Sequence, residues 1–408
     1  MEVIYRRCAG LDVHKDTVVA CARLVEERGV RQEVRTFATT TPGLYALSEW
    51  LAGCGVTHAG MEATGVYWKP VWHVLEEGLE LVLANAAHVK NVPGRKTDVN
   101  DAMWLADLLA HGLIRGSFVP ERPIQELRDL TRARKQFMRE RTGHVQRIQK
   151  VLEDANVKLA SVISDVTGKT GRAILDAMVD GETDARELAK HRHPKMKATL
   201  AEMEQALAGR VTPHHRFMLG LYLGQVDATD AAVAQIELEA DGLLESFRAK
   251  VNLLITMPGV GETVAEAILA EIGSDMSRFP TAAHLISWAG LCPRNDESAG
   301  KRRCTRIRQG APWLKVMMVQ AAWSAIKVKN GPLREQFLRL KSRRGPGKAI
   351  VAVAATMLRA AYVMLRDDVA FRDTRPAHPA ASEPDRVKNR LVHRLQSLGY
   401  EVQLKRAA

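Results

Sequence analysis

The sequence predicts an α/β domain followed by a long, mainly helical region. Three observations lead to this fold class. The chain has 408 residues, more than one ordinary hydrophobic core accommodates, so we expect two or three domains. Its first third alternates strand-like and helix-like stretches, whereas strand signals fade after about Pro120. Later stretches carry apolar residues at three- and four-residue spacing among dense charge, which is typical of amphipathic helices.

The first third is expected to form five strands and two helices. Its opening stretch, CAGLDVHKDTVVACARLV, reads as two strands on either side of a polar turn. This order of elements is that of a ribonuclease-H-like fold, although many other α/β folds use the same elements. The strands are predicted within residues 8–25 (two strands), 31–39, 55–68 and 79–85, and the helices at 69–78 and 98–112.

Four regions are predicted along the chain. The first, 1–119, is the α/β domain, and the second, 120–250, is a helical region that is partly coiled coil. The third, 251–370, is mainly helical, and the last, 371–408, is a Pro/Ala-rich linker and a tail.

Charge and composition favour a nucleic-acid partner. The formal net charge is +12 and the pI is about 9.6, and the basic residues are clustered. The five cysteines form no Cys-x-x-Cys pair, which argues against a disulfide framework and a cysteine zinc site and fits a reducing, cytoplasmic location. The most apolar late segment, AIVAVAATMLRAAYVML, is interrupted by Arg359 and is too short for a membrane span, so it predicts a buried helix.

Four carboxylates are candidate metal ligands. Asp98 and Asp101 lie three residues apart where a helix is predicted to begin, so they could cap the helix or share one of its faces. Asp12 lies in the first apolar strand, where an unpaired charge is costly, and Glu62 lies at the end of another strand. If the fold is ribonuclease-H-like, these elements converge. A site with only oxygen ligands suits Mg²⁺ or Mn²⁺ and phosphoryl chemistry.

The segment MPGVGETVAEAILAEIG predicts a turn between two helices. Gly259 and Gly261 permit the turn, and Thr263 with Glu266 forms a capping box for the next helix, which Gly273 ends. This is either a plain helical corner or a helix-hairpin-helix motif whose backbone N–H groups contact a DNA phosphate.

A polar loop carries the candidate nucleophile Ser298. An isolated loop serine is usually a turn former, but a nucleophilic serine needs nearby cations to compensate the charge that develops at phosphorus. Arginines and a lysine follow it directly, namely Lys301, Arg302, Arg303, Arg306 and Arg308.

A second basic group lies in the helical middle region. Its charges are equally consistent with a solvated helix face and with a surface that tracks a phosphate backbone. The group comprises Arg132, Arg134, Lys135, Arg139 and Arg141.

Together these motifs resemble one family. GLDVHKDTV, MEATGVYW, GRKTDVNDAMWLA, MPGVGETVAEAILAEIG, WAGLCPRNDESAGKRR and LGYEV, in this order, are similar to the DEDD transposases of bacterial insertion sequences, the insertion sequence 110 family. The resemblance implies an N-terminal RuvC-like DEDD domain and a C-terminal transposase domain with a nucleophilic serine, joined by a coiled coil. Family members often have glycine directly after the serine, whereas Ala299 intervenes here.

By this resemblance Asp12, Glu62, Asp98 and Asp101 would bind metal, and Ser298 would form a covalent phosphoserine intermediate with DNA. The resemblance also implies donor and target DNA as substrates, a bridge RNA as guide, and a homo-oligomer, dimer or tetramer, that brings the two sites together. Two alternatives are a RuvC-like junction nuclease in which water attacks, and a non-catalytic nucleic-acid-binding protein.

Overall fold

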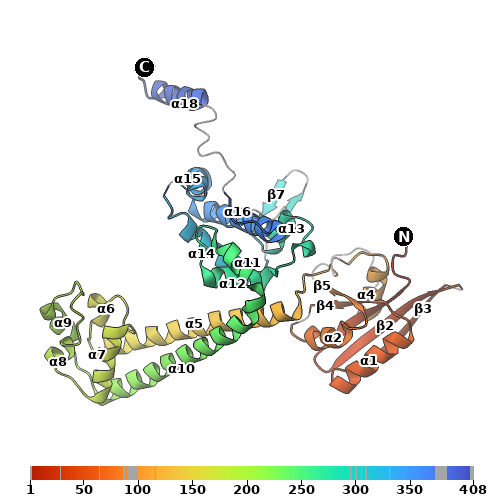
Figure 1. Cartoon of the computed structure of the whole chain (residues 1–408), viewed down its shortest axis with the longest axis horizontal. Helices are drawn as coiled ribbons and strands as arrows, with labels where there is room; N and C mark the ends of the chain where they lie inside the picture. Colours follow the sequence, from red (N-terminus) through yellow and green to blue (C-terminus); the bar gives the residue numbers. More distant parts are fainter. Residues whose placement is uncertain are drawn as a thin grey trace. The chain divides into compact units, whose positions relative to one another are not determined.

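The structure is a computed structural model, and the chain divides into two compact units, Met1–Val119 and Pro120–Ala408 (Figure 1). Each unit is described by itself below. The residues that the structure describes are 2–27, 29–63, 65–85, 89, 100–114, 116–293, 296–298, 301–304, 306–307, 310–329, 331–372 and 384–404.

The first unit is built on a mixed five-stranded sheet in the order β3-β2-β1-β4-β5. The first three strands are antiparallel neighbours, whereas β4 and β5 run parallel to β1. All five predicted strands are present, which confirms an α/β N-terminal unit. Their bounds are β1 Arg7–Val13, β2 Thr17–Glu26, β3 Gly29–Ala38, β4 His58–Glu62 and β5 Glu80–Ala84.

Helices cover both faces of this sheet. On one face, α1 (Thr41–Gly53) and α2 (Trp68–Leu75) pack against the alternate strand residues that include Leu11 and Met61. On the other face lies α4 (Asp101–Ala110), whose residues pack on β1 and β2. The helix α1 was not among the predicted elements, although its buried leucines are three and four residues apart.

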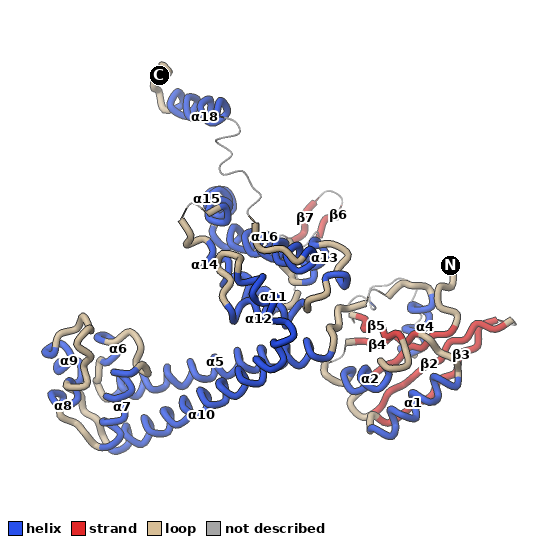
Figure 2. Tube along the Cα trace, in the orientation of Figure 1, coloured by secondary structure: helices blue, strands red, loops and turns tan. Residues whose placement is uncertain are grey.

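The second unit contains a long antiparallel helix pair, α5 (Arg122–Asp154) and α10 (Pro213–Leu244), seen in Figure 2. Two ion pairs show the direction: Arg134 pairs with Glu237, and Arg141, farther along α5, pairs with Asp230, which is earlier in α10. The four short helices between them build a separate apolar core with the ends of the pair. They are α6 Leu159–Val162, α7 Lys169–Asp180, α8 Ala185–Ala189 and α9 Leu200–Leu207.

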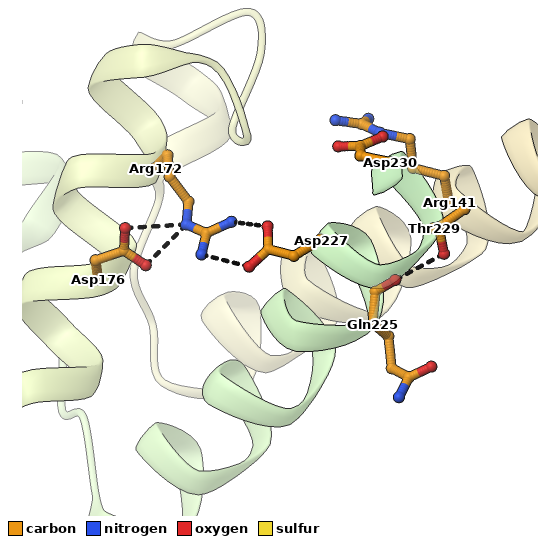
Figure 3. A network of polar contacts seen from close by, with 7 residues as sticks. All are labelled: Arg141, Arg172, Asp176, Gln225, Asp227, Thr229 and Asp230. Atoms are coloured by element: carbon orange, nitrogen blue, oxygen red, sulfur yellow. Dashed lines mark hydrogen bonds and ion pairs between the residues drawn. The ribbon is translucent and has the colours of Figure 1, made fainter. Parts of the chain in front are cut away.

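An arginine of α7, Arg172, forms ion pairs that connect this helix to α10 (Figure 3). The Arg172 Nε atom of α7 donates to both oxygens of Asp176, at 2.8 and 2.9 Å, and its Nη2 atom donates to Asp227 of α10 at 2.8 Å. Its hydrogen bond to Asp227 raises the pKa of Arg172 and lowers that of Asp227. Such a planar fork suits arginine rather than lysine.

The rest of the second unit is mainly helical, as predicted, apart from one hairpin of strands. The strands β6 (Asp296–Ser298) and β7 (Lys301–Cys304) interrupt a region for which the sequence predicted only helices and a loop. The helices are α11 Arg248–Ile255, α12 Glu262–Ile272, α13 Ala282–Trp288, α14 Pro312–Ala325, α15 Pro332–Arg344, α16 Pro346–Asp367 and α18 Pro384–Ser397, with short 3₁₀ turns at Glu245–Phe247 and Met276–Arg278.

The helix α16 is the core of this part of the unit. It packs against α13, α14 and α15 and buries residues such as Val353, Met357 and Tyr362. Among the described helices it alone is long and apolar enough to cross a membrane, but more than half of its apolar window is buried inside the unit. The prediction of a buried helix is therefore confirmed.

Candidate active site

Gly10 lets helix α4 lie unusually close to strand β1. A Cβ atom at this position would lie 2.1 Å from the Ala102 carbonyl oxygen and 2.4 Å from the Ala106 nitrogen. Two residues earlier, the Cys8 Sγ atom donates to the Ala106 carbonyl at 3.5 Å. Since β1 proceeds from Cys8 to Gly10 while its contacts move back along α4, the start of α4 lies at the end of β1.

The strand register places Asp12 and Glu62 side by side at that end of the sheet. Leu11 pairs with Met61 in the parallel register of β1 and β4, so Asp12 and Glu62 each follow a paired residue by one position. Successive side chains alternate between the faces of a sheet. Leu11 and Met61 lie in the core beneath α1 and α2, so Asp12 and Glu62 lie on the face that α4 covers.

Asp101 is brought to the same edge by the first turn of α4. The helix begins at Asp101, and Asn100 is its N-cap, with the Asn100 side chain accepting from the Ala102 N–H at 2.9 Å. The prediction that Asp98 caps this helix is therefore wrong. Asn and Asp are equally good caps, and the sequence pattern did not distinguish them. Asp98 itself lies outside the described residues.

The side chains at this edge are not gathered as ligands around one point. Within the described part of the chain, no three His, Cys, Asp or Glu side chains form a group that could hold a metal ion. The Asp12 Oδ2 atom lies 3.2 Å from the Nε2 atom of His14, an exposed residue of the β1–β2 turn. His14 was not among the predicted site residues. Its position two residues after Asp12 in the sequence could have indicated that the two side chains are close.

In the second unit, Ser298 is the last residue of strand β6. Its Cα pairs with Lys301, and Glu297 pairs with Arg302 across the hairpin, with an irregularity between Asp296 and Glu297. The predicted loop is thus a strand end directly before a two-residue connection. The side chains from Ser298 to Arg303 are not described, and Arg308 lies outside the described residues, whereas Arg306 is exposed.

Close backbone packing fixes the base of this hairpin. A bridge joins Pro293 to Ile307, and the Ala311 N–H donates to the Trp288 carbonyl at 3.2 Å. A Cβ atom on Gly310 would lie 2.3 Å from the Gly290 nitrogen. The two strands therefore start from a fixed base, and the backbone of Ser298 is at the far end.

The two predicted phosphate-binding glycines have different surroundings. A Cβ atom on Gly259 (φ +82°) would lie 2.5 Å from the Ala321 oxygen and 2.5 Å from the Ala325 nitrogen, so this glycine is required for packing on α14. Gly261 is exposed and caps α12, with open space around it. The helix begins at Glu262, so the predicted Thr263 capping box is wrong, whereas Gly273 does end the helix.

The basic group of α5 has partners within the unit. Arg132 forms a two-pronged ion pair with the buried Glu271 of α12, with N···O distances of 2.7 and 2.8 Å. Arg134 pairs with Glu237, and the Lys135 Nζ atom lies 3.4 Å from the Met317 Sδ atom, where burial lowers the lysine pKa. These contacts hold α5 to its neighbours, so a role for the group in binding nucleic acid stays a prediction.

Two sequence models of transposase families match the chain. One, for DEDD transposases of the IS110 type and described as "Transposase", matches residues 9–157, and the other, described as "Transposase IS116/IS110/IS902 family", matches residues 251–338. The first segment contains all four candidate carboxylates, and the second contains Ser298 and both glycines of the helical corner.

Individual proteins are similar over shorter or longer spans. The insertion element IS110 uncharacterized 43.6 kDa protein of Streptomyces coelicolor is 30% identical over 145 residues, which are 35% of this chain and 35% of that protein. The pilin gene-inverting protein of Moraxella bovis is 30% identical over 126 residues, 30% of this chain and 38% of that protein. These two matches thus span little more than a third of each relative.

A longer match is more distant. The insertion element IS900 uncharacterized 42 kDa protein of Mycobacterium paratuberculosis is 24% identical over 342 residues, which are 74% of this chain and 82% of that protein. This similarity covers both units of the chain.

Proposed function

Since the chain belongs to the insertion sequence 110 family of transposases, we propose that it cuts and rejoins donor and target DNA. The observation that carries the proposal is the convergence of the end of β1, the end of β4 and the start of α4 at one sheet edge. Asp12, Glu62 and Asp101 stand on these three ends, and we propose that a bound cation draws their side chains together. Carboxylates that stand on neighbouring element ends can share a divalent cation, which offsets the repulsion between their charges.

The donor set fits a hard divalent cation. Asp12, Glu62 and Asp101, with Asp98 as the fourth, offer only carboxylate oxygens, which Mg²⁺ and Mn²⁺ prefer. A bound ion of this class would neutralise charge on a phosphodiester and on its leaving oxygen. The chain's own contribution is placement: Gly10 holds the start of α4 against β1, and Asn100 fixes the first turn on which Asp101 stands.

We further propose Ser298 as the nucleophile. Its Oγ atom would bond to the scissile phosphorus, the Oγ proton would pass to a base, and the displaced deoxyribose oxygen would gain a proton. The basic residues that follow it, Lys301 to Arg303, would compensate the charge that develops at phosphorus. The support is the hairpin itself, which presents Ser298 at a strand end on a closely packed base.

The finer features belong to the same proposal. The strand order supports a ribonuclease-H-like, RuvC-like N-terminal domain, and the Gly259–Gly261 corner supports a helix-hairpin-helix contact made through Gly261. The four domains 1–119, 120–250, 251–370 and 371–408, a bridge RNA and a homo-oligomer complete it. A junction nuclease, in which water attacks, is the alternative that the carboxylate edge equally favours.

A strand-transfer assay tests the carboxylate edge. The assay contains labelled donor and target DNA, Mg²⁺ and, as the proposed bridge RNA, a transcript of the non-coding DNA that flanks the gene for this chain. We expect Asp12→Asn or Asp101→Asn to abolish Mg²⁺-dependent strand transfer. Asp16→Asn is the matched control, because it removes an exposed carboxylate four residues from Asp12. Full activity of Asp12→Asn with unchanged metal dependence would refute the site.

A further inference from the structure

Charge is strongly segregated along the second half of the transposase. From Ser298 to Arg366 the sequence contains sixteen Lys and Arg residues and a single acidic residue, Glu335. Most cations of α5 are neutralised by nearby carboxylates, but this segment cannot neutralise itself. Such an excess of positive charge favours contact with an external polyanion.

The densest part of this charge lies where α15 ends and α16 begins. We name it the α15 basic end. Each of its five side chains is exposed, and none has an ion-pair partner among the residues that the structure describes. The α15 basic end consists of Arg339, Lys341, Arg343, Arg344 and Lys348.

The α15 basic end stands on a firmly packed helix. Leu333 and Phe337 of α15 are buried, and the Phe337 ring packs edge to face on Trp323 of α14, with centroids 5.5 Å apart. The Gln336 side chain donates to the Thr356 hydroxyl of α16 at 2.9 Å. The cations are thus carried by a fixed support, which lowers the entropy lost when they bind a ligand.

The spacing of the charges suits a phosphate backbone. Arg339 and Arg343, four residues apart, lie on one side of the helix, and Lys341 and Arg344, three apart, lie on another. At 1.5 Å per residue these four charges occupy only about 7.5 Å of helix length. The helix dipole favours cations in the last turn by about 0.3–1 kcal/mol, and this effect does not account for Arg339 or for Lys348 beyond the turn.

We propose that the α15 basic end binds the sugar-phosphate backbone of double-stranded DNA. Single strands are held by aromatic side chains that stack on bases, and no aromatic residue occurs from Leu338 to Lys348. A cluster of cations with no aromatic residue inside it suits instead the charge of a duplex backbone. The inference rests on the proposed function for its substrate, DNA, but it concerns binding and not the chemistry of Ser298.

The test is equilibrium binding of the full chain to a labelled 30-base-pair DNA of arbitrary sequence, titrated over a range of salt concentrations without divalent metal. The variant is Lys341→Gln/Arg343→Gln/Arg344→Gln. The control, Lys169→Gln/Arg186→Gln/Lys195→Gln, makes the same change in net charge with exposed residues of the short-helix segment that also have no ion pair among the described residues. Circular dichroism checks that both variants are folded.

We expect the first variant to bind DNA at least about tenfold more weakly at 0.1 M salt, with a salt slope smaller by about 2–3, since each lost phosphate contact removes about 0.9 from the slope. The control should remain within about twofold of wild type. An equal loss in the control, or wild-type binding by the first variant, would overturn the proposal. The same titration is made with an RNA duplex of the same sequence. If the first variant bound this RNA more weakly than wild type but bound the DNA equally well, the proposal would also be overturned. Because no cleavage is involved, an inactive Ser298 would leave the result unchanged.

Discussion

At the scale of single residues, Gly10 sets how closely α4 lies on the sheet. A methyl group there would meet backbone atoms of α4 at distances that side chains do not tolerate, so the helix must move. We expect Gly10→Ala to destabilise the contact between β1 and α4 by about 1–3 kcal/mol. Amide hydrogen exchange in both elements measures the loss. Gly53→Ala is the control, because a Cβ atom there has open space around it, and slow wild-type exchange in Gly10→Ala would contradict the argument.

Two buried thiols make the first unit sensitive to alkaline pH. Burial raises the pKa of Cys8 to about 11 and that of Cys21 to about 12, from an ordinary value of 9.0. Above pH 9 the unfolded chain loses these protons while the folded chain keeps them, so stability must fall as pH rises from 9 towards 11 and is unaffected by these thiols below pH 9. Urea unfolding over this range should show a loss of roughly 4 kcal/mol, about half of it from each thiol, and Cys8→Ala/Cys21→Ala should remove this loss. An equal loss in that variant would assign it to other groups.

The predicted end of a helix was correct where a backbone conformation that favours glycine determines it. The predicted start of a helix was wrong where two nearby residues could each serve as the N-cap. Gly273, with φ of +72°, ends α12 as its sequence position indicated. The caps Asn100 and Gly261 replaced the predicted Asp98 and Thr263, because both choices satisfy helix-start chemistry and tertiary packing selects between them. Asp12 was chosen because a charge in an apolar strand is costly, and Glu62 because it ends another strand. The register places both at the same end of the sheet, and their role as metal ligands stays a prediction.

At the scale of elements, Glu271 joins α12 to α5. Its side chain is 3% exposed and faces Arg132, while the Arg128 guanidinium donates to the Ala270 and Glu271 carbonyl oxygens at 3.0 and 2.8 Å. Burial lowers the pKa of Arg128 to about 10. Removing the one carboxylate would leave two cations with insufficient compensation.

We therefore expect Glu271→Gln to cost about 3–5 kcal/mol, measured by urea unfolding, because a buried charge loses its partner. Glu237→Gln removes the exposed partner of Arg134 and should cost less than about 1 kcal/mol. Similar costs in the two variants would show that burial does not strengthen the α5–α12 pair.

Element types were predictable where periodicity is strong and the segment is long. The sheet strands and the long helices α5 and α16 follow directly from apolar spacing. The strands β6 and β7 were not predicted, because their sequences are polar. Their pairing also depends on the packing of Gly310 on Gly290, two residues that lie outside both strands. The partners of Arg132 and Arg134 were equally out of reach, since Glu271 and Glu237 are more than a hundred residues away.

At the scale of the whole molecule, the proposed chemistry needs groups from two separate units: the carboxylates lie in Met1–Val119 and Ser298 in Pro120–Ala408. If an oligomer unites the two sites from different subunits, a mixture of Asp12→Asn and Ser298→Ala proteins should regain part of the strand-transfer activity that each lacks alone. Activity is measured on labelled DNA at constant total protein. A mixture as inactive as its components would mean that one subunit supplies both sites.

The measurement that tests the central claim most directly is capture of a covalent protein–DNA adduct on a denaturing gel. Wild type, Ser298→Ala and the control Ser287→Ala are incubated with labelled donor and target DNA, Mg²⁺ and transcript from the flanking non-coding DNA. We predict an adduct with wild type and Ser287→Ala that is absent with Ser298→Ala and with Asp12→Asn. Cleavage without any adduct, equal in wild type and Ser298→Ala, would contradict the account and make this chain a metal-dependent nuclease in which water attacks.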